Sequence, residues 1–326
     1  MTYVLGIDGG GTSTVAVIAD QHGKIYAQYH TSASNPTAMK SPAFETIIYQ
    51  CLRALQEQNP VVFHSVKSCF AGLAGVMEMG LEKSVYSIFK RFYGDEVSII
   101  IENDACIALY AGTLGKPGIV QIAGTGAITY GLGVNQQTAR TGGWGYLFDD
   151  EGSGYDVGVR ALKAIVKSYD GRGPETILTT KVLKHCGVEN VPELVHCVYS
   201  QEHPRTYIAS LSRYVEESAL QKDPIAREII ETSCAQFIEA IEACRKQTEW
   251  QKGMFIPVVL MGGVFTNFEL YEELLSIIIA KKQLPYVFIA PKVSPVGGAV
   301  IGALQRIERT LAYTFLKQFS QELKTH

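Results

Sequence analysis

Gly6-Ile7-Asp8-Gly9-Gly10-Gly11-Thr12-Ser13-Thr14 follows the apolar run Tyr3-Val4-Leu5 at the start of the chain. An apolar strand followed by an acid, a run of glycines and a row of hydroxyls predicts a hairpin that binds phosphate. Glycines let backbone N–H groups approach an anion closely, because no Cβ stands in the way. We expect Asp8 to bind a magnesium ion or its water shell, and we expect phosphate contacts from Gly9, Gly10, Gly11, Thr12 and Ser13. A glycine-rich turn without a ligand is the simpler alternative, although such a turn needs only one or two residues with positive φ.

A second segment of the same design lies far along the chain. The apolar run Val120-Gln121-Ile122-Ala123 leads into Gly124-Thr125-Gly126, and a further strand continues to Tyr130. The repetition predicts an internally duplicated chain in which two phosphate loops face each other and hold a nucleotide between them. A Gly-x-x-x-x-Gly-Lys-Ser/Thr loop is absent from the sequence, and position 129 is Thr where a dinucleotide fingerprint has its third glycine.

The composition excludes several classes of protein. The 326 residues suffice for two domains, with 47% hydrophobic and 19% charged residues and a net charge of −3. We therefore expect no nucleic-acid partner. No apolar run approaches the roughly 20 residues that cross a bilayer, so we also expect no membrane segment and no signal peptide before the first strand.

The seven cysteines lack any Cys-x-x-Cys spacing, which predicts a reducing, cytoplasmic location. His185-Cys186 and His196-Cys197 are the only His/Cys groupings. Adjacent residues on a helix point about 100° apart, so we expect no metal site in either pair.

The order of elements predicts an α/β fold, with an antiparallel start followed by a mainly parallel sheet. The pattern breaks at Gly115-Lys116-Pro117-Gly118, where we place a domain boundary. After it the chain becomes mostly helical. Strands are expected at 3–5, 15–20, 24–30, 66–73, 97–101, 257–261 and 286–289, and helices at 43–58, 78–92, 154–169, 175–186, 205–220, 224–247, 267–282 and from 297 onward.

These features resemble the superfamily of sugar kinases, actin and heat-shock ATPases, and within it the N-acetylglucosamine kinase branch of the BadF/BadG-type ATPase family. The resemblance covers nearly the whole chain. Besides the two glycine-rich turns it rests on Glu102-Asn103-Asp104-Ala105, Gly142-Gly143-Trp144-Gly145, Asp150-Glu151-Gly152-Ser153, Met261-Gly262-Gly263-Val264 and Pro295-Val296-Gly297-Gly298-Ala299.

For the fold, the resemblance implies two ribonuclease-H-like domains of the actin-like ATPase type with an interdomain cleft. Residues 1–117 form the first domain in this interpretation, and 118–299 form the second, which is enriched in helices. The C-terminal helix, about 300–326, packs back on the first domain.

For the chemistry, Asp104 matches the family's catalytic base, which accepts the proton of a sugar hydroxyl as that oxygen attacks the γ-phosphate of ATP. Its place after a strand suits this role, because ligands of α/β sheets bind at the carboxyl ends of strands. Asp104 as a helix N-cap is the alternative. Gly262 and Gly263 match the adenosine loop, and Ala209 matches a helix that lines the adenine. ATP and Mg²⁺ are the implied cofactors.

The sugar contacts that the resemblance implies use three kinds of group. An indole offers a flat face to sugar C–H groups, a carboxylate accepts from hydroxyls, and an amide both donates and accepts. Trp144 as a core aromatic and Asn35 as a turn residue are the alternatives. The implied contacts are Asn35, Asn103, Asp104, Gly143, Trp144, Gly145 and Asp150.

One position departs from the family, whose Gly-Asp-Glu-Gly-Ser is here Asp149-Asp150-Glu151-Gly152-Ser153. If the Asp149 carboxylate points toward the sugar, it favours a cationic amino sugar over an anionic one. If it points to solvent, it has no effect on the choice of sugar.

The resulting hypothesis is an ATP-dependent kinase that phosphorylates the 6-hydroxyl of N-acetylglucosamine or a close amino sugar, as a homodimer, in amino-sugar metabolism or cell-wall recycling. Glucosamine and N-acetylmuramic acid kinases are the alternatives within this class. A BadF-type ATPase activator of a dehydratase or reductase would hold an iron–sulfur cluster at its dimer interface through a cysteine such as Cys69 or Cys106. A sugar-sensing regulator without turnover is a third reading.

Overall fold

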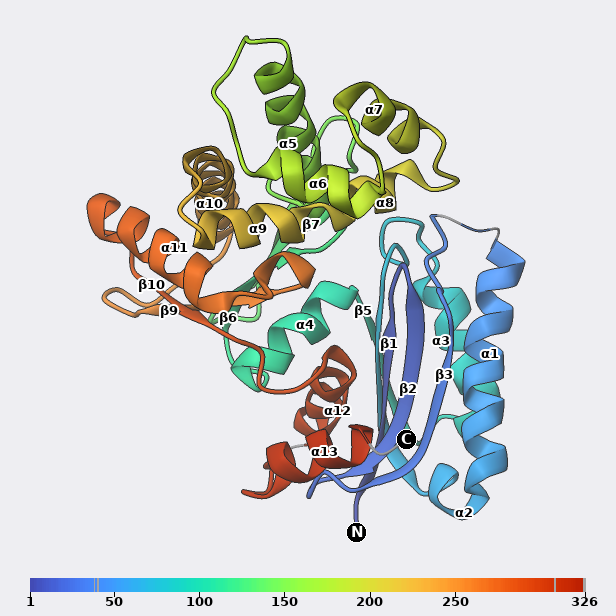
Figure 1. Ribbon diagram of the computed structural model, residues 1–326. Helices are drawn as coiled ribbons and strands as arrows, with labels where there is room; N and C mark the ends of the chain where they lie inside the picture. The colour runs from blue at the N-terminus through green and yellow to red at the C-terminus, as the bar shows by residue number, and fades with distance from the viewer. Residues whose placement is uncertain (38, 40, 308, 325–326) are drawn as a thin grey trace. The chain divides into compact units, whose positions relative to one another are not determined.

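The computed structural model describes residues 1–37, 39, 41–307 and 309–324. The chain forms two compact units (Figure 1). The first unit comprises Met1–Lys116 and Pro291–His326, and the second comprises Pro117–Ala290. Both units have the α/β architecture expected from the sequence, with a mixed five-stranded sheet in each.

The sheet of the first unit places three strand ends at one edge. Strands β1 to β3 form an antiparallel meander, whereas β4 and β5 run parallel to β1. In this register Asp8 of β1 pairs with Gly72 of β4, and Gly72 pairs with Glu102 of β5. The sheet order is β3-β2-β1-β4-β5, with β1 at Tyr3–Gly9, β2 at Ser13–Asp20, β3 at Ile25–Ser32, β4 at Val66–Leu73 and β5 at Ser98–Glu102.

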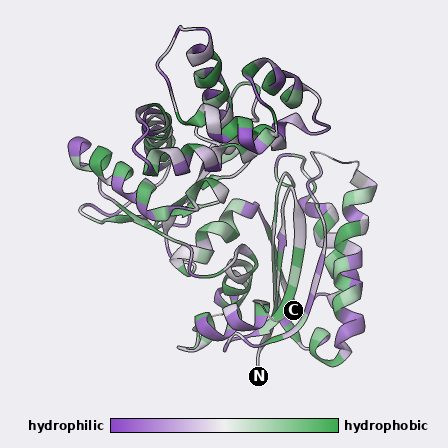
Figure 2. Cartoon of the chain, viewed as in Figure 1, coloured by the Kyte–Doolittle hydropathy of each residue, from purple (hydrophilic) through white to green (hydrophobic). Residues whose placement is uncertain are grey.

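Helices cover both faces of this sheet, as the alternation of side chains along its strands requires. Leu5 and Ile7 of β1 join the core that also contains Phe44 and Phe89, from α1 (Ser41–Gln58) and α3 (Glu82–Tyr93). In Figure 2 purple and green residues alternate along α1, as expected for a helix with one apolar face. The other helices are α2 (Pro60–Phe63), α4 (Asp104–Thr113), α12 (Pro295–Arg306) and α13 (Phe315–Lys324).

Helix α12 packs on β1, β4 and α4. These contacts place the segment from Pro291 onward in the first unit, whereas the sequence analysis assigned residues up to 299 to the second domain. The assignment differs because the contacts of α12 lie far away in the sequence, and a sequence pattern does not record them. The expected C-terminal helix is divided in two, since α12 ends at Arg306 and α13 begins at Phe315.

The sheet of the second unit repeats the topology of the first. Its order read from the other end, β8-β7-β6-β9-β10, has the same antiparallel meander of three strands followed by two parallel strands. This repetition confirms the internal duplication expected from the two glycine-rich turns. The strands are β6 (Gly118–Ala123), β7 (Ala127–Leu132), β8 (Thr138–Gly142), β9 (Ile256–Met261) and β10 (Tyr286–Ile289).

The second unit differs from the first by a helical segment between β8 and β9. The helix expected over 205–220 is two helices, because the chain turns at Leu211, whose N–H donates to the Ile208 carbonyl. Helix α7 and strand β8 were not predicted. The helices are α5 (Gly154–Tyr169), α6 (Leu178–Cys186), α7 (Val191–Tyr199), α8 (Pro204–Ser210), α9 (Ser212–Leu220), α10 (Pro224–Arg245) and α11 (Phe268–Lys282), with a 3₁₀ turn, η1, at Gly263–Phe265.

Among the described residues, no helix combines the length and the apolar character that crossing a membrane requires.

The close packing of α12 on α4 can be tested at Gly298. A Cβ on Gly298 would overlap the carbonyl oxygen of Ile107 and would lie 2.8 Å from the backbone nitrogen of Ala111. Backbone atoms of a packed helix cannot move aside cheaply, so Gly298→Ala should destabilise the protein by about 1–3 kcal/mol. Chemical denaturation measures this change. Arg306→Ala, at an exposed position in the same helix, is the matched control and should stay within about 0.5 kcal/mol. Equal stability of both variants would contradict the α4–α12 contact.

Candidate functional site

Two carboxylates stand at one edge of the first sheet. Asp8 lies at the carboxyl end of β1, and Asp104 is the first residue of α4, two positions after the end of β5. Burial, together with the nearby charge of Asp104, raises the pKa of Asp8 to about 7. A desolvated carboxylate beside another is unfavourable unless it has a proton or a cation. A cation bound at this edge would offset the cost of ionising Asp8.

Asn103 caps the helix that Asp104 begins. The Asn103 Oδ1 accepts from the backbone N–H of Ala105 at 2.9 Å, and its Nδ2 donates to Glu78 Oε1 at 3.4 Å. The alternative of Asp104 as the N-cap is therefore wrong: Asn103 has that role, and the Asp104 carboxylate is not used for it. Glu78, on the turn after β4, is a neighbour of this site that the sequence analysis missed.

The glycine-rich hairpin that joins β1 to β2 has a close-packed base and an open tip. A Cβ on Gly9 would come within 2.5 Å of the Ser34 hydroxyl, whose Oγ is buried and makes no hydrogen bond within the described structure. The Gly10 N–H donates to the Ser13 carbonyl at 3.0 Å, which closes the turn. Gly11, Thr12 and Ser13 are exposed and leave their donors accessible.

Asn35 has the geometry of a turn residue. Its Oδ1 accepts from the backbone N–H of Thr37 at 2.9 Å and from the Thr37 hydroxyl at 2.7 Å. A Cβ on Gly75 would come within 2.5 Å of the same oxygen. The turn interpretation is therefore correct for Oδ1, and any sugar contact would use the amide nitrogen.

In the second unit, Asp150 lies against the Gly124-Thr125-Gly126 turn. Its carboxylate is buried and forms an ion pair with Arg205 of α8, with Oδ2 and Nη2 3.1 Å apart. A Cβ on Gly126 would meet that carboxylate at 2.8 Å, so the turn requires glycine at this position. Asp150 has φ = 66°, a left-handed conformation that Asp tolerates better than most residues.

The charge of Asp150 is balanced by several groups. Burial raises its pKa, and the charge of Asp149 raises it further, whereas the Ala127 N–H and Arg205 lower it. Arg205 also stacks over the ring of Tyr146 at 4.7 Å. Arg205 was not predicted, because a cation far from a motif carries no signal without the fold.

The loop around Trp144 is exposed. The Trp144 side chain has 67% of its surface exposed, so the alternative of a core aromatic is wrong. The guanidinium of Arg140 lies 4.7 Å from the centre of the indole, and Arg140 Nη2 donates to the Gly143 carbonyl at 2.8 Å. The Asp149 Oδ2 accepts from the Trp144 N–H at 2.7 Å. Asp149 thus stabilises the loop, in which Gly143 and Gly145 have positive φ.

Gly262 and Gly263 directly follow β9, beside the end of β6. Gly262 has φ = 112°, and a Cβ on it would overlap the backbone of Ala123. Because β6 and β9 are parallel and Ile122 pairs with Met261, the turns after the two strands lie next to each other. The carbonyl of Ala209 lies near Gly154, whose N–H donates to Gly124 at 2.7 Å. The turn that begins at Gly124 thus lies next to Gly262 and next to Gly154, which packs against Ala209.

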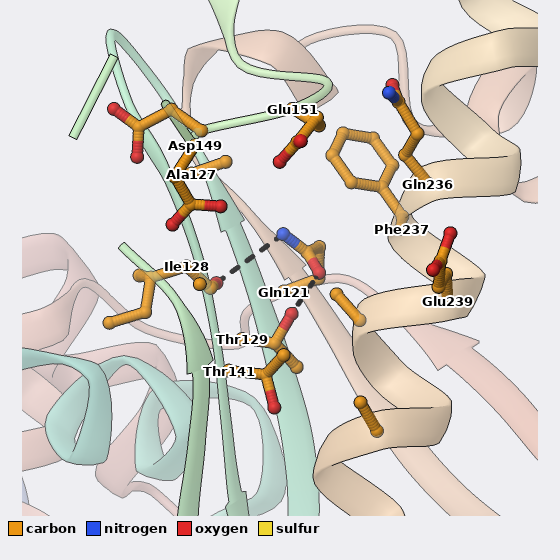
Figure 3. A pocket seen from close by; sticks show the side chains of 14 residues that line it. Gln121, Ala127, Ile128, Thr129, Thr141, Asp149, Glu151, Gln236, Phe237 and Glu239 are labelled. Carbon is orange, nitrogen blue, oxygen red and sulfur yellow. Dashed lines mark hydrogen bonds between the residues drawn. The ribbon is translucent and has the colours of Figure 1, made fainter. Parts of the chain in front are cut away.

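The second unit has a pocket of about 250 Å³, which Asp150 helps to line (Figure 3). Gln121 forms part of its wall: its amide donates to the Ile128 carbonyl and accepts a hydrogen bond from Thr129. The acidic and amide side chains that line it are Asp149, Asp150, Glu151, Glu239, Gln121 and Gln236. Two of these side chains, Gln236 and Glu239, come from α10 and had no signature in the sequence.

No group of three or more His, Cys, Asp or Glu side chains among the described residues has the geometry of a metal site. Mg²⁺ needs no such group, since it keeps several waters and uses one or two carboxylates together with phosphate oxygens. The partly buried carboxylate of Asp8, near Asp104, fits this requirement.

Comparison with known proteins decides the family. A model of the BadF/BadG/BcrA/BcrD ATPase family matches residues 5–303. The chain belongs to this family.

Two curated relatives cover most of the chain. The "N-acetylmuramic acid/N-acetylglucosamine kinase" of Clostridium acetobutylicum is 32% identical over 277 residues, which are 84% of this chain and 89% of the relative. The "N-acetyl-D-glucosamine kinase" of Dictyostelium discoideum is 32% identical over 287 residues, 83% of this chain and 88% of the relative. Among solved structures, a protein of Chromobacterium violaceum provisionally named N-acetylglucosamine kinase has the same fold, with a TM-score of 0.68 and 24% identity over 92% of this chain and 98% of that one.

The burial of Asp8 predicts an unusual dependence of stability on pH. The folded-state pKa, about 7, lies above the ordinary value of 3.8, so folding favours the protonated form. The cost of ionising Asp8 is absent below about pH 4, grows as the pH rises and is fully present above about pH 7. Asp8→Asn removes this cost. In the absence of nucleotide and metal, the variant should therefore unfold at a higher temperature than the wild type at about pH 8, and at a similar temperature near pH 4.

Thermal unfolding followed by circular dichroism measures this difference. Asp95→Asn is the control, because Asp95 is exposed and its pKa is lowered by Lys90. This variant should be no more stable than the wild type at either pH. An Asp8→Asn midpoint at or below that of the wild type at pH 8 would show that the Asp8 carboxylate is not destabilised by its surroundings.

Proposed function

We propose that this protein is an ATP-dependent amino-sugar kinase that transfers the γ-phosphate to the 6-hydroxyl of N-acetylglucosamine or a close relative. The observation that carries the proposal is the pair formed by Asp8 and Asp104 at the carboxyl ends of β1 and β5. The Asp8 carboxylate suits a cation that accompanies phosphate, and the Asp104 carboxylate is assigned the role of the base. Both curated relatives are named as kinases of this sugar class.

In this proposal Asp104 accepts the proton of the sugar hydroxyl as the oxygen attacks phosphorus. A positioned carboxylate of this kind contributes about 10²–10⁴-fold to the rate. Its position is fixed because Asn103 forms the helix cap and α4 packs against α12. Asp8 would hold Mg²⁺ through its water shell, and the ion would neutralise charge on the phosphates.

The phosphate groups of ATP are assigned to the open tips of the two glycine-rich turns. In the first unit the donors are the exposed Gly11, Thr12 and Ser13, with Gly9 and Gly10 forming the close-packed base. In the second unit they are Gly124, Thr125 and Gly126. Adenosine is assigned to Gly262, Gly263 and Ala209. Gly262 lies against Ala123, and Ala209 lies near Gly154, whose N–H donates to Gly124, which supports a single binding surface around this turn.

Sugar recognition is assigned to Asp150 and to the loop that carries Trp144. The buried Asp150 carboxylate, held by Arg205, is a strong acceptor for sugar hydroxyls. The exposed indole offers one face to sugar C–H groups, while Arg140 covers part of the ring. Gly143 and Gly145 give this loop its positive-φ conformation, and Asn35 and Asn103 complete the assignment.

The activator hypothesis is disfavoured by the burial of its candidate cysteines. A cluster at a subunit interface needs a thiol on the surface. Cys69 is 0% exposed and Cys106 is 4% exposed. Burial also raises the pKa of the Cys69 thiol well above its usual range, which disfavours the thiolate that binds iron.

A homodimeric state, a cytoplasmic location and a role in cell-wall recycling remain part of the proposal. The family resemblance implies all three.

A sugar panel tests the proposed reaction. ADP release is measured with ATP and Mg²⁺ against N-acetylglucosamine, glucosamine, N-acetylmuramic acid, N-acetylmannosamine and glucose. Asp104→Asn should lower kcat by about 10²–10⁴-fold while nucleotide still binds, because only the base is lost. Glu102→Gln, two residues away and half-buried, is the matched control and should keep most of the activity. No sugar-dependent ADP release from the wild type would refute the kinase, and equal activity of both variants would remove Asp104 as the base.

The charge of Asp149 should affect the preference of the enzyme between cationic and neutral sugars. Its carboxylate raises the pKa of Asp150, so it lies close enough to act on the same ligand. Asp149→Asn keeps an acceptor for the Trp144 N–H and removes only the charge. The ratio of kcat/KM for glucosamine to that for N-acetylglucosamine should therefore fall about fivefold, the equivalent of about 1 kcal/mol. Asp149→Gly removes the hydrogen bond too and should also raise the KM of both sugars. An unchanged ratio in Asp149→Asn would show that this carboxylate does not act on the substrate.

A further inference from the structure

Two cysteines stand apart from the others in the second unit. All seven cysteines are free, and five of them are buried. Cys186 and Cys197 are partly exposed. Cys186 is the last residue of α6, and Cys197 lies in the last turns of α7, a helix that begins only five residues later. The two most accessible thiols of the chain thus come from neighbouring helices.

Both sulfur atoms reach the same hydroxyl group. The Tyr207 hydroxyl lies 2.9 Å from Cys186 Sγ and 3.5 Å from Cys197 Sγ. The thiols also interact with each other, since Cys197 contributes to the raised pKa of Cys186, of which burial is the main cause. The amide of Gln201 donates to the Cys197 sulfur at 3.8 Å. A disulfide requires two cysteines whose backbones lie within about 7 Å of each other. Two sulfur atoms that share one hydroxyl partner and interact with each other are candidates for such a bond.

Tyr207 connects this pair to the proposed sugar site. It lies on α8, two residues after Arg205, whose guanidinium holds the Asp150 carboxylate. The ring of His185 stacks on Tyr207 with centroids 5.9 Å apart, so the tyrosine is in contact on several sides. Helix α8 also packs closely on α5, because a Cβ on Gly158 would overlap the Ile208 carbonyl. Tyr207 and Arg205 thus share one short helix that packs closely on α5.

We propose that Cys186 and Cys197 form a reversible disulfide by exchange with a low-molecular-weight disulfide, and that this bond weakens sugar binding through Tyr207, α8 and the Arg205–Asp150 ion pair. The effect on sugar binding rests on the proposed function; the disulfide itself does not.

The chemistry balances without any further reactant. The thiolate of one cysteine attacks a sulfur of the small disulfide, forms a mixed disulfide and releases one small thiolate. The second cysteine loses its proton and attacks the mixed disulfide, which releases the other small thiolate. Two protein thiols are oxidised, and one small disulfide is reduced to two thiols. In the product neither sulfur carries a proton, so the hydrogen bonds around the Tyr207 hydroxyl must rearrange.

Glutathione buffers of different oxidised-to-reduced ratio test the bond directly in the full chain. After alkylation of the remaining thiols, peptide mass spectrometry should find Cys186 linked to Cys197 at oxidising ratios and both alkylated at reducing ratios. Cys197→Ser should instead carry a mixed disulfide with glutathione on Cys186. Cys234→Ser, a change at a buried cysteine, should form the Cys186–Cys197 bond as the wild type does. Absence of the intramolecular bond in the wild type at every ratio, or bonds to other cysteines, would overturn the proposal.

Steady-state kinetics in the same buffers test the consequence. Oxidised wild type should show a sugar KM raised several-fold with a smaller change in the KM of ATP, and a thiol reductant should restore it. The double variant Cys186→Ser/Cys197→Ser should be insensitive to oxidised glutathione. If the bond forms and the sugar KM stays unchanged, the coupling through α8 is refuted. If no sugar is phosphorylated under any condition, the proposed function fails. The mass-spectrometric result still shows whether Cys186 and Cys197 form a disulfide.

Discussion

The parallel pairing of β1, β4 and β5 is the constraint on which the first unit's chemistry depends. Parallel strands end at the same edge of a sheet, and the register places Asp8, Gly72 and Glu102 in line. Asp104 follows at the start of α4, so two carboxylates far apart in the sequence become neighbours. A protein that needed only stability would not bury one carboxylate beside another. The arrangement is understandable when a cation and phosphate are its partners.

The second unit has the same sheet topology but different side chains at its strand ends. Its corresponding strand end, at β6, carries no acid and continues into Gly124-Thr125-Gly126. The acid comes instead from Asp150, which reaches the turn from the loop after β8 and is balanced by Arg205. Duplication of one sheet thus produced two edges with different chemistry. In the first, two carboxylates lie near each other and raise the cost of ionisation; in the second, a carboxylate is paired with an arginine and is suited to hydrogen-bond a neutral or cationic ligand.

Much of this could be predicted from the sequence, because the determining signals are local. The apolar strands, the glycine-rich turns and the acids after strand ends lie within short segments, and their order indicated the duplicated α/β fold. Strand β8 was missed because Thr138-Ala139-Arg140-Thr141-Gly142 is mostly polar, although it pairs with β7. The break at Leu211 was missed because the pattern of apolar residues continues through it.

The partners of the predicted residues could not be found in this way. Arg205, Arg140 and Glu78 acquire their roles only when the fold brings them to Asp150, Trp144 and Asn103. The same holds for helix caps: Asn103 and Asp104 are both good N-cap residues, and only the backbone geometry assigns the cap to Asn103. Local sequence patterns therefore suggested the candidate residues, whereas the contacts between these residues needed the structure.

The central claim is that the surroundings of Asp8 raise the pKa of its carboxyl group, and that a bound cation lowers it again. Carbon-13 NMR of the labelled aspartate carboxyl groups, with Asp8 assigned by substitution, measures its pKa in the full chain. The account predicts a pKa of about 7 in the free protein, and a clear fall when Mg²⁺ and a non-hydrolysable ATP analogue are added. A pKa near the ordinary value of 3.8 under both conditions would contradict it.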